Sequence, residues 1–300
     1  MGRRIGPGAA ALATLVCASS LFGASAIFAK LSYAHGCGVL ALLAARYLGS
    51  TLVTVPLALR QERGAWREAA QPWLWLVVGV FNVASAGLYM GALSYDHVGR
   101  IAPIVFVFPA LIAGLGWLHF RYPIGRKLGA ALLVGVCGTI LVFGSDIGAP
   151  SKVLGGVLAV LTALAASYYF ITAARFTAGR WRTTSAISFG MGTLLFVPLA
   201  IGTGSHLPHG IGWLWLACMV VLGGVVPYLA QISALSKVGS TKGGVVAMLE
   251  PVVAVALAAA ALGETMSGLQ AAGAGLVLAS FVLATLPLQR LRRSGRPAPG

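Results

Sequence analysis

The sequence predicts an all-α polytopic membrane protein with ten transmembrane helices, and three observations support this prediction. First, the 300 residues are 58% hydrophobic and only 9% charged, whereas soluble domains carry about 25% charged residues. Second, the apolar residues form stretches near the ~20 residues that a helix needs to cross a bilayer. Third, the basic residues, which give a net charge of +15, lie between these stretches instead of in one patch. This pattern excludes a soluble enzyme, a disordered protein and a disulfide-knit domain, and it argues against a nucleic-acid binder.

The ten spans are the stretches that are free, or nearly free, of charged residues. The second span contains Arg46 and the ninth contains Glu250, and no other span has a charge near its centre. Residues 183–236 hold no charge but are too long for one helix, and the turn-like cluster His206–Gly210 divides them into two spans. The first apolar run exceeds the ~7–15 residues of a signal-peptide core, so we expect it to remain as a helix. The predicted helices cover residues 9–29, 38–59, 72–93, 100–119, 127–144, 153–174, 185–203, 212–234, 242–262 and 268–287.

The distribution of lysine and arginine predicts the orientation of the chain. Ten spans place both termini on the same side of the membrane. Seventeen of the 21 lysines and arginines fall on that side, three fall on the other side, and Arg46 lies within a span. By the positive-inside rule both termini are cytoplasmic and the protein lies in the cell membrane. Residues 288–300 then form a basic cytoplasmic tail.

The two halves of the chain share a sequence pattern. The run Leu93–Gly99 precedes an apolar helix with Phe108-Pro109, and the run Leu235–Gly239 precedes an apolar helix with Glu250-Pro251. A helix rich in glycine and alanine follows in each half. Each half holds five spans, an odd number, so the second copy is inverted in the membrane. Inverted repeats are characteristic of secondary transporters, whose binding sites lie near the midplane between the repeats.

In their order and spacing, these residues resemble EamA-type proteins of the drug/metabolite transporter superfamily. The runs Val238–Lys242, Leu249–Val253 and Leu262–Thr265 are similar to a Gly–small–Thr entry, an acidic-Pro pair within a helix and a Gly-Glu exit. Arg46 falls where such proteins commonly carry an arginine in the second helix.

The first half departs from this pattern. Phe108 stands in place of the acidic residue, and Arg121-Tyr122 stands in place of the Gly-Glu pair. The resemblance still implies one EamA-like five-helix repeat in residues 9–144 and another in residues 153–287. It also implies transport of a small metabolite, often outward, by alternating access.

Arg46 and Glu250 are the only ionisable residues well inside the predicted spans. A charge at the centre of a transmembrane helix costs about 2.5–3.5 kcal/mol on insertion scales, so such residues face a partner or a wet cavity. At ~1.5 Å per residue, both approach the midplane, from opposite sides. Two interpretations stay open for each: a site for a substrate charge or a coupling proton, and a structural ion pair between helices.

Seven further residues are candidates for the wall of a substrate cavity. Asn82, Ser85 and Tyr89 recur at spacings of three and four residues, which places them on one helix face. Tyr228 and Gln231 share a face just beyond a proline, where a broken helix is tolerated next to protein or water. Two aromatic residues of the fourth and sixth spans complete the set, and interhelical packing is the alternative interpretation throughout. The candidates are Asn82, Ser85, Tyr89, Phe106, Tyr169, Tyr228 and Gln231.

These observations predict a secondary transporter that exports a small metabolite, either amino acid-like or a small amphipathic or cationic compound. The alternatives are a passive channel and a non-transporting scaffold. An enzyme is disfavoured because the sequence has no nucleophile motif, no metal-binding motif and no pair of intramembrane acids. We expect no metal, no cofactor and no nucleic-acid partner. The expected partners are the substrate, the lipid bilayer and protons as a coupling ion, while the oligomeric state is left open.

Overall fold

The structure, a computed structural model, describes residues 7–64, 73–96, 98–121, 124–143, 153–263 and 265–285. Within these ranges it is all helical and contains no strand. Ten helical stretches are long and apolar enough to cross a membrane, which confirms the predicted fold class and number of spans. The elements are α1 (Pro7–Ala34), α2 (Val39–Gln61), α4 (Trp73–Tyr95), α5 (Val98–Val105), α6 (Phe108–Phe120), α7 (Arg126–Phe143), α8 (Val153–Phe176), α9 (Trp181–Gly202), α10 (Gly212–Val220), η1 (Val221–Val225), α11 (Val226–Val238), α12 (Ser240–Ala247), α13 (Leu249–Leu262) and α14 (Gly268–Thr285).

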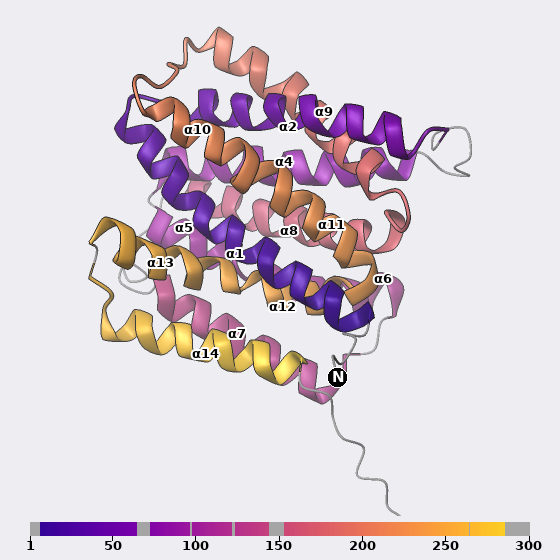
Figure 1. The fold of residues 1–300 in the computed structure, drawn as a ribbon. Helices are drawn as coiled ribbons and strands as arrows, with labels where there is room; N and C mark the ends of the chain where they lie inside the picture. Colours follow the sequence, from indigo (N-terminus) through magenta and orange to yellow (C-terminus); the bar gives the residue numbers. More distant parts are fainter. Residues whose placement is uncertain are drawn as a thin grey trace, which may run out of the picture.

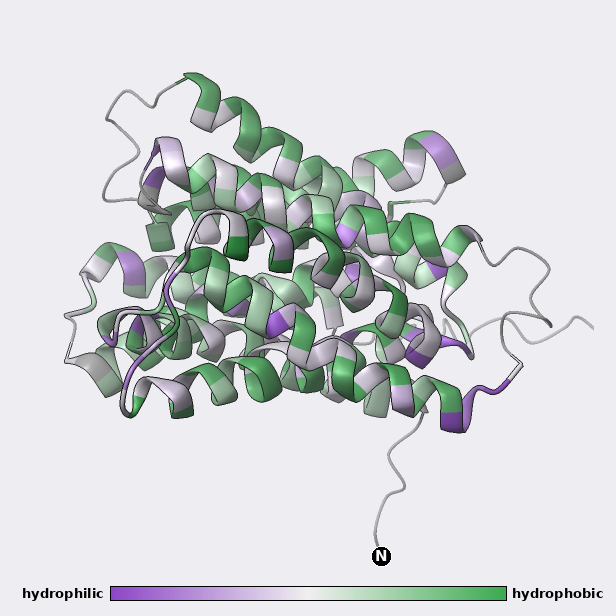
Figure 2. Ribbon diagram, turned by 90° about the horizontal axis from the view of Figure 1, so that it is seen from above, coloured by the Kyte–Doolittle hydropathy of each residue, from purple (hydrophilic) through white to green (hydrophobic). Residues whose placement is uncertain are grey.

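The chain is helical because a bilayer offers the backbone no hydrogen-bond partners, so each span must satisfy its own. Figure 2 shows hydrophobic residues along the helices and hydrophilic residues mainly at their ends and connections. The predicted turn at His206–Gly210 separates α9 from α10. Three spans extend about a turn beyond the prediction: α1 to Ala34, α9 back to Trp181 and the eighth span to Val238. Each added turn carries a basic residue, Lys30, Arg182 or Lys237, and long basic side chains are favoured at the ends of membrane spans because their charged groups stay in water while their stems cover apolar surface. The predicted basic tail, residues 288–300, lies outside the described residues.

The helices pack in a pattern that recurs in the two halves with their roles exchanged. In the first half α1 packs on α11, α12 and α13, and in the second half α8 packs on α4, α5 and α6. The second helices of the halves, α2 and α9, pack along each other, and so do the fifth, α7 and α14 (Figure 1). This is the inverted-repeat architecture that the sequence predicted.

The crossing of α7 and α14 shows the two-fold relation at the level of atoms. A Cβ atom on Gly138 would lie 2.8 Å from the carbonyl oxygen of Gly273, and one on Gly273 would lie 2.6 Å from the carbonyl oxygen of Gly138. The two backbones are therefore in direct contact, which only glycine allows at this point.

The fourth and ninth spans are each broken at the same place. Pro109 and Pro251 lack an N–H group and follow directly after the breaks. Around the breaks the hydrogen bonds tighten to a three-residue spacing: Val107 N–H donates to Ile104 O and Met248 N–H donates to Val245 O, both at 3.3 Å. The prolines thus divide one span into α5 and α6 and the other into α12 and α13.

The eighth span contains a π-helical segment, which the sequence analysis had not predicted. In η1 the hydrogen bond spacing widens, and the N–H of Val226 donates to the carbonyl of Val221. Two buried glycines, Gly223 and Gly224, form its centre. The irregularity precedes Pro227 instead of following it. Such π-bulges occur frequently at functional sites because they re-aim the surrounding side chains.

Helices α2 and α9 are joined at both ends by hydrogen bonds from the backbone of one helix to a side chain that follows the other. Beyond the end of α2, the Glu62 carboxylate accepts hydrogen bonds from the N–H of Thr183 at 2.8 Å and of Arg182 at 3.2 Å. Beyond the end of α9, the Ser205 hydroxyl accepts one from the N–H of Ala41 at 3.0 Å. Glu62 and Ser205 therefore accept hydrogen bonds from N–H groups in the first turns of α9 and α2, respectively, which have no partner within their own helix.

Candidate functional site

Arg46 projects from α2 into the interior of the bundle. Its side chain is half-buried, and its Nε atom is fully buried with no hydrogen-bond partner in the described part of the chain. Its guanidinium carbon lies 5.9 Å from the centre of the Phe22 ring on α1, within the range of a cation–π contact. One turn later, Ser50 Oγ is also buried without a partner. Two polar groups of α2 thus face the interior unsatisfied.

The π-helical segment η1 contacts both of these groups. A Cβ atom on Gly224 would lie 2.9 Å from Ser50 Oγ and 3.6 Å from Arg46 Nε. Because glycine has no side chain, η1 can approach α2 closely and leave the two polar atoms facing its backbone. The sequence analysis did not use the glycine pair before Pro227, which is the sequence feature that accompanies this segment.

Glu250 approaches α1 from the other side. It lies half-buried in the first turn of α13, and a Cβ atom on Gly23 would come 2.5 Å from its carbonyl oxygen. Arg46 and Glu250 therefore meet consecutive residues of α1, Phe22 and Gly23. No ion pair within 4.0 Å joins Arg46 and Glu250, both of which are described residues. The two ionisable residues thus approach the same stretch of α1 without forming an ion pair.

Three of the predicted cavity residues come together next to these charges. The Tyr169 hydroxyl on α8 donates a hydrogen bond of 2.9 Å to Gln231 Oε1 on α11. The rings of Tyr169 and Tyr228 stack with centres 5.9 Å apart. All three side chains are buried. The hydroxyls of Tyr228 and of Ser188 on α9 are buried without a hydrogen-bond partner in the described chain.

Tyr47 links this group to α2 and α4. Its ring packs against Phe189 at 5.9 Å and Phe196 at 5.0 Å, both on α9. Its hydroxyl faces the side chain of Asn82 on α4. Gly192 leaves room for the Tyr47 ring at the α2–α9 crossing. Asn82 therefore borders the same interior region as Arg46.

These residues form one set, which we name the polar cluster. The sequence analysis missed three of its members, Tyr47, Ser50 and Ser188. Two of them had a signal, since Tyr47 adjoins Arg46 and Ser50 lies one turn after it, but Ser188 is one small polar residue among many. The cluster comprises Arg46, Tyr47, Ser50, Asn82, Tyr169, Ser188, Tyr228, Gln231 and Glu250.

The remaining candidates lie apart from the centre of the cluster. Ser85 and Tyr89 are half-buried further along α4, and Tyr89 packs with the apolar group around Ala92. Phe106 packs with Phe108 at 6.0 Å and with Phe143 at 5.7 Å between ring centres. It therefore reaches Tyr169 only through other aromatic rings.

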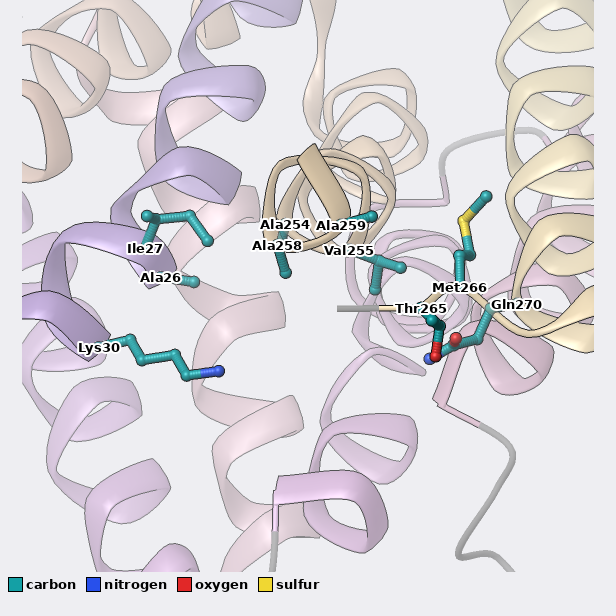
Figure 3. Close-up of a pocket in the computed structure, with 10 residues that line it drawn as sticks. All are labelled: Ala26, Ile27, Lys30, Ala254, Val255, Ala258, Ala259, Thr265, Met266 and Gln270. Atoms are coloured by element: carbon teal, nitrogen blue, oxygen red, sulfur yellow. The ribbon is translucent and has the colours of Figure 1, made fainter. Parts of the chain in front are cut away.

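A cavity of about 220 Å³ lies elsewhere, between α1, α13 and α14 (Figure 3). None of the seven predicted cavity residues lines it. Lys30 reaches into it from α1, while Thr265 and Gln270 face it from the opposite side (Figure 3).

Comparisons with known proteins agree on the type of protein. The EamA-like transporter family matches residues 9–144 and again residues 153–286. The threonine/homoserine exporter RhtA of two Salmonella typhimurium strains is 28% identical over 211 residues, covering 70% of this chain but only 64% of RhtA. An uncharacterized transporter of Archaeoglobus fulgidus is 23% identical over 217 residues, 70% of this chain and 75% of that protein. A solved structure described only as a crystal structure of a protein has the same fold, with a TM-score of 0.79 at 20% identity, over 92% of this chain and 96% of that one.

Proposed function

The chain belongs to the EamA-like transporter family, and we propose that it exports a small zwitterionic metabolite of the amino acid class. The family makes it a membrane transporter, and the name of the RhtA exporters supports outward transport of an amino acid. The polar cluster supports the charge type of the substrate. It offers one cation, one carboxylate, several hydroxyls and an amide within one region of the bundle.

The observation that carries this proposal is that Arg46 lies against Phe22 of α1 and the backbone of Glu250 lies against the next residue, Gly23, while the two side chains form no ion pair. Buried charges are costly unless they are paired or hydrogen-bonded. A zwitterion supplies both missing partners: its carboxylate accepts from the Arg46 guanidinium and its ammonium donates to Glu250. Arg46 also presents the fork of donors that matches a carboxylate.

Glu250 also gives a route to coupling with protons. The Glu250 carboxylate can bind a proton or the ammonium of the substrate, but not both at once. Entry of a proton from one side of the membrane therefore favours release of the substrate on that side. Acidic side chains inside spans commonly serve as proton relays. Alternating access then carries the substrate out as the proton moves in.

The outward direction requires an orientation, and we propose that both termini are cytoplasmic. The described ends of the chain, at α1 and α14, lie at the same end of the bundle (Figure 1), and the bias of lysine and arginine places that end inside. Cysteine accessibility from each side of the membrane tests this. A C-terminus labelled from outside intact cells contradicts it.

The substrate type is tested by removing one charge at a time from the protein and, separately, one charge at a time from the ligand. The purified chain is reconstituted in proteoliposomes, and exchange of labelled threonine is competed with threonine, with threoninamide and with 2,3-dihydroxybutyrate, which lacks the amino group. In the wild type both analogues should compete at least tenfold more weakly than threonine. In Arg46→Gln the threoninamide penalty should vanish, and in Glu250→Gln the 2,3-dihydroxybutyrate penalty should vanish.

Lys242→Gln serves as the matched control because it removes an exposed charge of α12 outside the cluster. It should behave as the wild type toward all three ligands. If both analogues compete as well as threonine, or if each variant loses all ligands equally, the zwitterion proposal fails. Exchange without trans-stimulation in the wild type supports a channel instead of a carrier.

A further inference from the structure

The cavity between α1, α13 and α14 is a groove that is open to one side. Its floor comes from small side chains of α13, and its two rims come from the end of α1 and the start of α14 (Figure 3). Ala26 on one rim and Met266 on the other are exposed, so the groove opens toward the surroundings of the bundle. Its lining residues are Ala26, Ile27, Lys30, Ala254, Val255, Ala258, Ala259, Thr265, Met266 and Gln270.

The positions in the first repeat that correspond to the floor of the groove are enclosed in the described structure. Under the relation that matches Glu250 to Phe108, Ala254 corresponds to Ile112 and Ala258 to Gly116. Ile112 and Gly116 are buried, whereas Ala254 and Ala258 are half-exposed. The fold therefore does not require an opening at this position. The groove is a feature of α1 and α13, which touch at Gly23 and Glu250 and leave a space beyond that contact.

The chemistry of the groove changes along its length. The polar groups, the Lys30 ammonium and the side chains of Thr265 and Gln270, gather near the end of α1, where that span reaches the membrane surface. Toward the middle of the span the lining consists of alanine and valine side chains and Ile27. The volume of about 220 Å³ is below the roughly 300–1,000 Å³ that encloses a whole drug-sized ligand. The groove thus fits part of a larger amphipathic molecule.

We propose that this groove binds one anionic phospholipid, with the phosphate against Lys30 and one acyl chain along Ala254 and Ala258. The positive charge at the membrane surface complements the phosphate, and the apolar floor complements the chain. An ammonium near the surface contributes about 1 kcal/mol to the binding of an anionic lipid, which corresponds to about fivefold in affinity. Because the groove continues the α1–α13 contact at Gly23 and Glu250, a lipid there holds these two helices apart on one side of the bundle.

Native mass spectrometry of the full chain tests this proposal. Protein stripped of lipid in detergent is titrated with phosphatidylglycerol or with phosphatidylcholine, and the first bound lipid is counted. Ala258→Phe fills the groove and Lys30→Gln removes its charge. The matched controls are Gly114→Phe, which adds the same bulk at an open site on α6, and Lys242→Gln, which removes an exposed charge from α12.

The wild type and both controls should retain one phosphatidylglycerol in preference to phosphatidylcholine. Lys30→Gln should weaken that first binding step about fivefold, and Ala258→Phe should abolish it. Equal retention in Ala258→Phe and Gly114→Phe, or equal retention of the two lipids by the wild type, overturns the proposal. Displacement of the lipid by glycerol 3-phosphate at equal concentration also overturns it, because the site then recognises the phosphate group alone. Melting temperatures in lipid-free detergent show that each variant is folded.

Discussion

The fourth and ninth spans occupy equivalent positions in the two repeats but differ at their centres. Both break before a proline, at Pro109 and at Pro251. At the first break Phe108 is buried among aromatic rings, and its carbonyl accepts a hydrogen bond of 3.1 Å from Ser167 Oγ. At the second break Glu250 is half-buried, and its carbonyl lies against Gly23.

This difference separates what the fold needs from what the function needs. Both repeats keep the proline break and the close contact of the preceding carbonyl with the first helix of the other half. Only one repeat keeps a carboxylate there, next to the unsatisfied Arg46. The broken helix is therefore the shared structural element, and the carboxylate is present only in the ninth span, where we propose that it serves recognition and coupling.

The largest effect should come from removing the acid. Glu250→Gln preserves shape and hydrogen bonding but cannot release a proton, so exchange of substrate should persist while its stimulation by a pH gradient is lost completely. Phe108→Leu, at the equivalent position of the fourth span, should leave that stimulation within about twofold of the wild type. Uptake into proteoliposomes with and without an imposed gradient measures both. Wild-type gradient dependence in Glu250→Gln would leave this residue with a structural role only.

A second comparison concerns the two fastened ends of the α2–α9 pair. Glu62 is 8% exposed and accepts three hydrogen bonds as a charged group, so Glu62→Ala should lower the free energy of unfolding by about 1.5–3 kcal/mol. Ser205 accepts one as a neutral hydroxyl, so Ser205→Ala should cost about 1 kcal/mol. Unfolding in mixed micelles measures both. Equal costs at the two ends would show that the carboxylate adds nothing beyond a cap.

The smallest effect is expected on α4, whose polar residues border the cluster from the side. Asn82→Leu removes the group that faces the Tyr47 hydroxyl and should weaken substrate binding severalfold. Tyr89→Ala, two turns further along α4, should weaken it less because its side chain packs with an apolar group. Both proteins should stay folded and monodisperse. Loss of monodisperse protein in Asn82→Leu would assign this side chain to helix packing.

Hydropathy was sufficient to predict the ten spans, because a helix that crosses a bilayer must be long and apolar wherever it packs. The internal pattern of the halves predicted the inverted repeat, and the helix spacing of Tyr228 and Gln231 correctly placed them on one face. The π-helical segment was not predicted, since it depends on the close approach of Gly224 to α2. The partners of Glu62 and the space beside Ala258 were also missed. They arise where segments far apart in sequence meet, and local periodicity does not report such contacts.

The double-mutant cycle of Arg46→Gln and Glu250→Gln, measured as stability without substrate, distinguishes a site for substrate charges from a structural ion pair. If the two residues await a substrate, as the absence of an ion pair between them indicates, the stability changes of the single variants should add in the double variant within about 0.5 kcal/mol. With saturating substrate, the same variants should show lowered substrate-induced stabilisation, because each removes a partner of the ligand. A coupling of about 1–3 kcal/mol in the substrate-free protein would show that the residues hold each other, and would contradict the proposed recognition of a zwitterion.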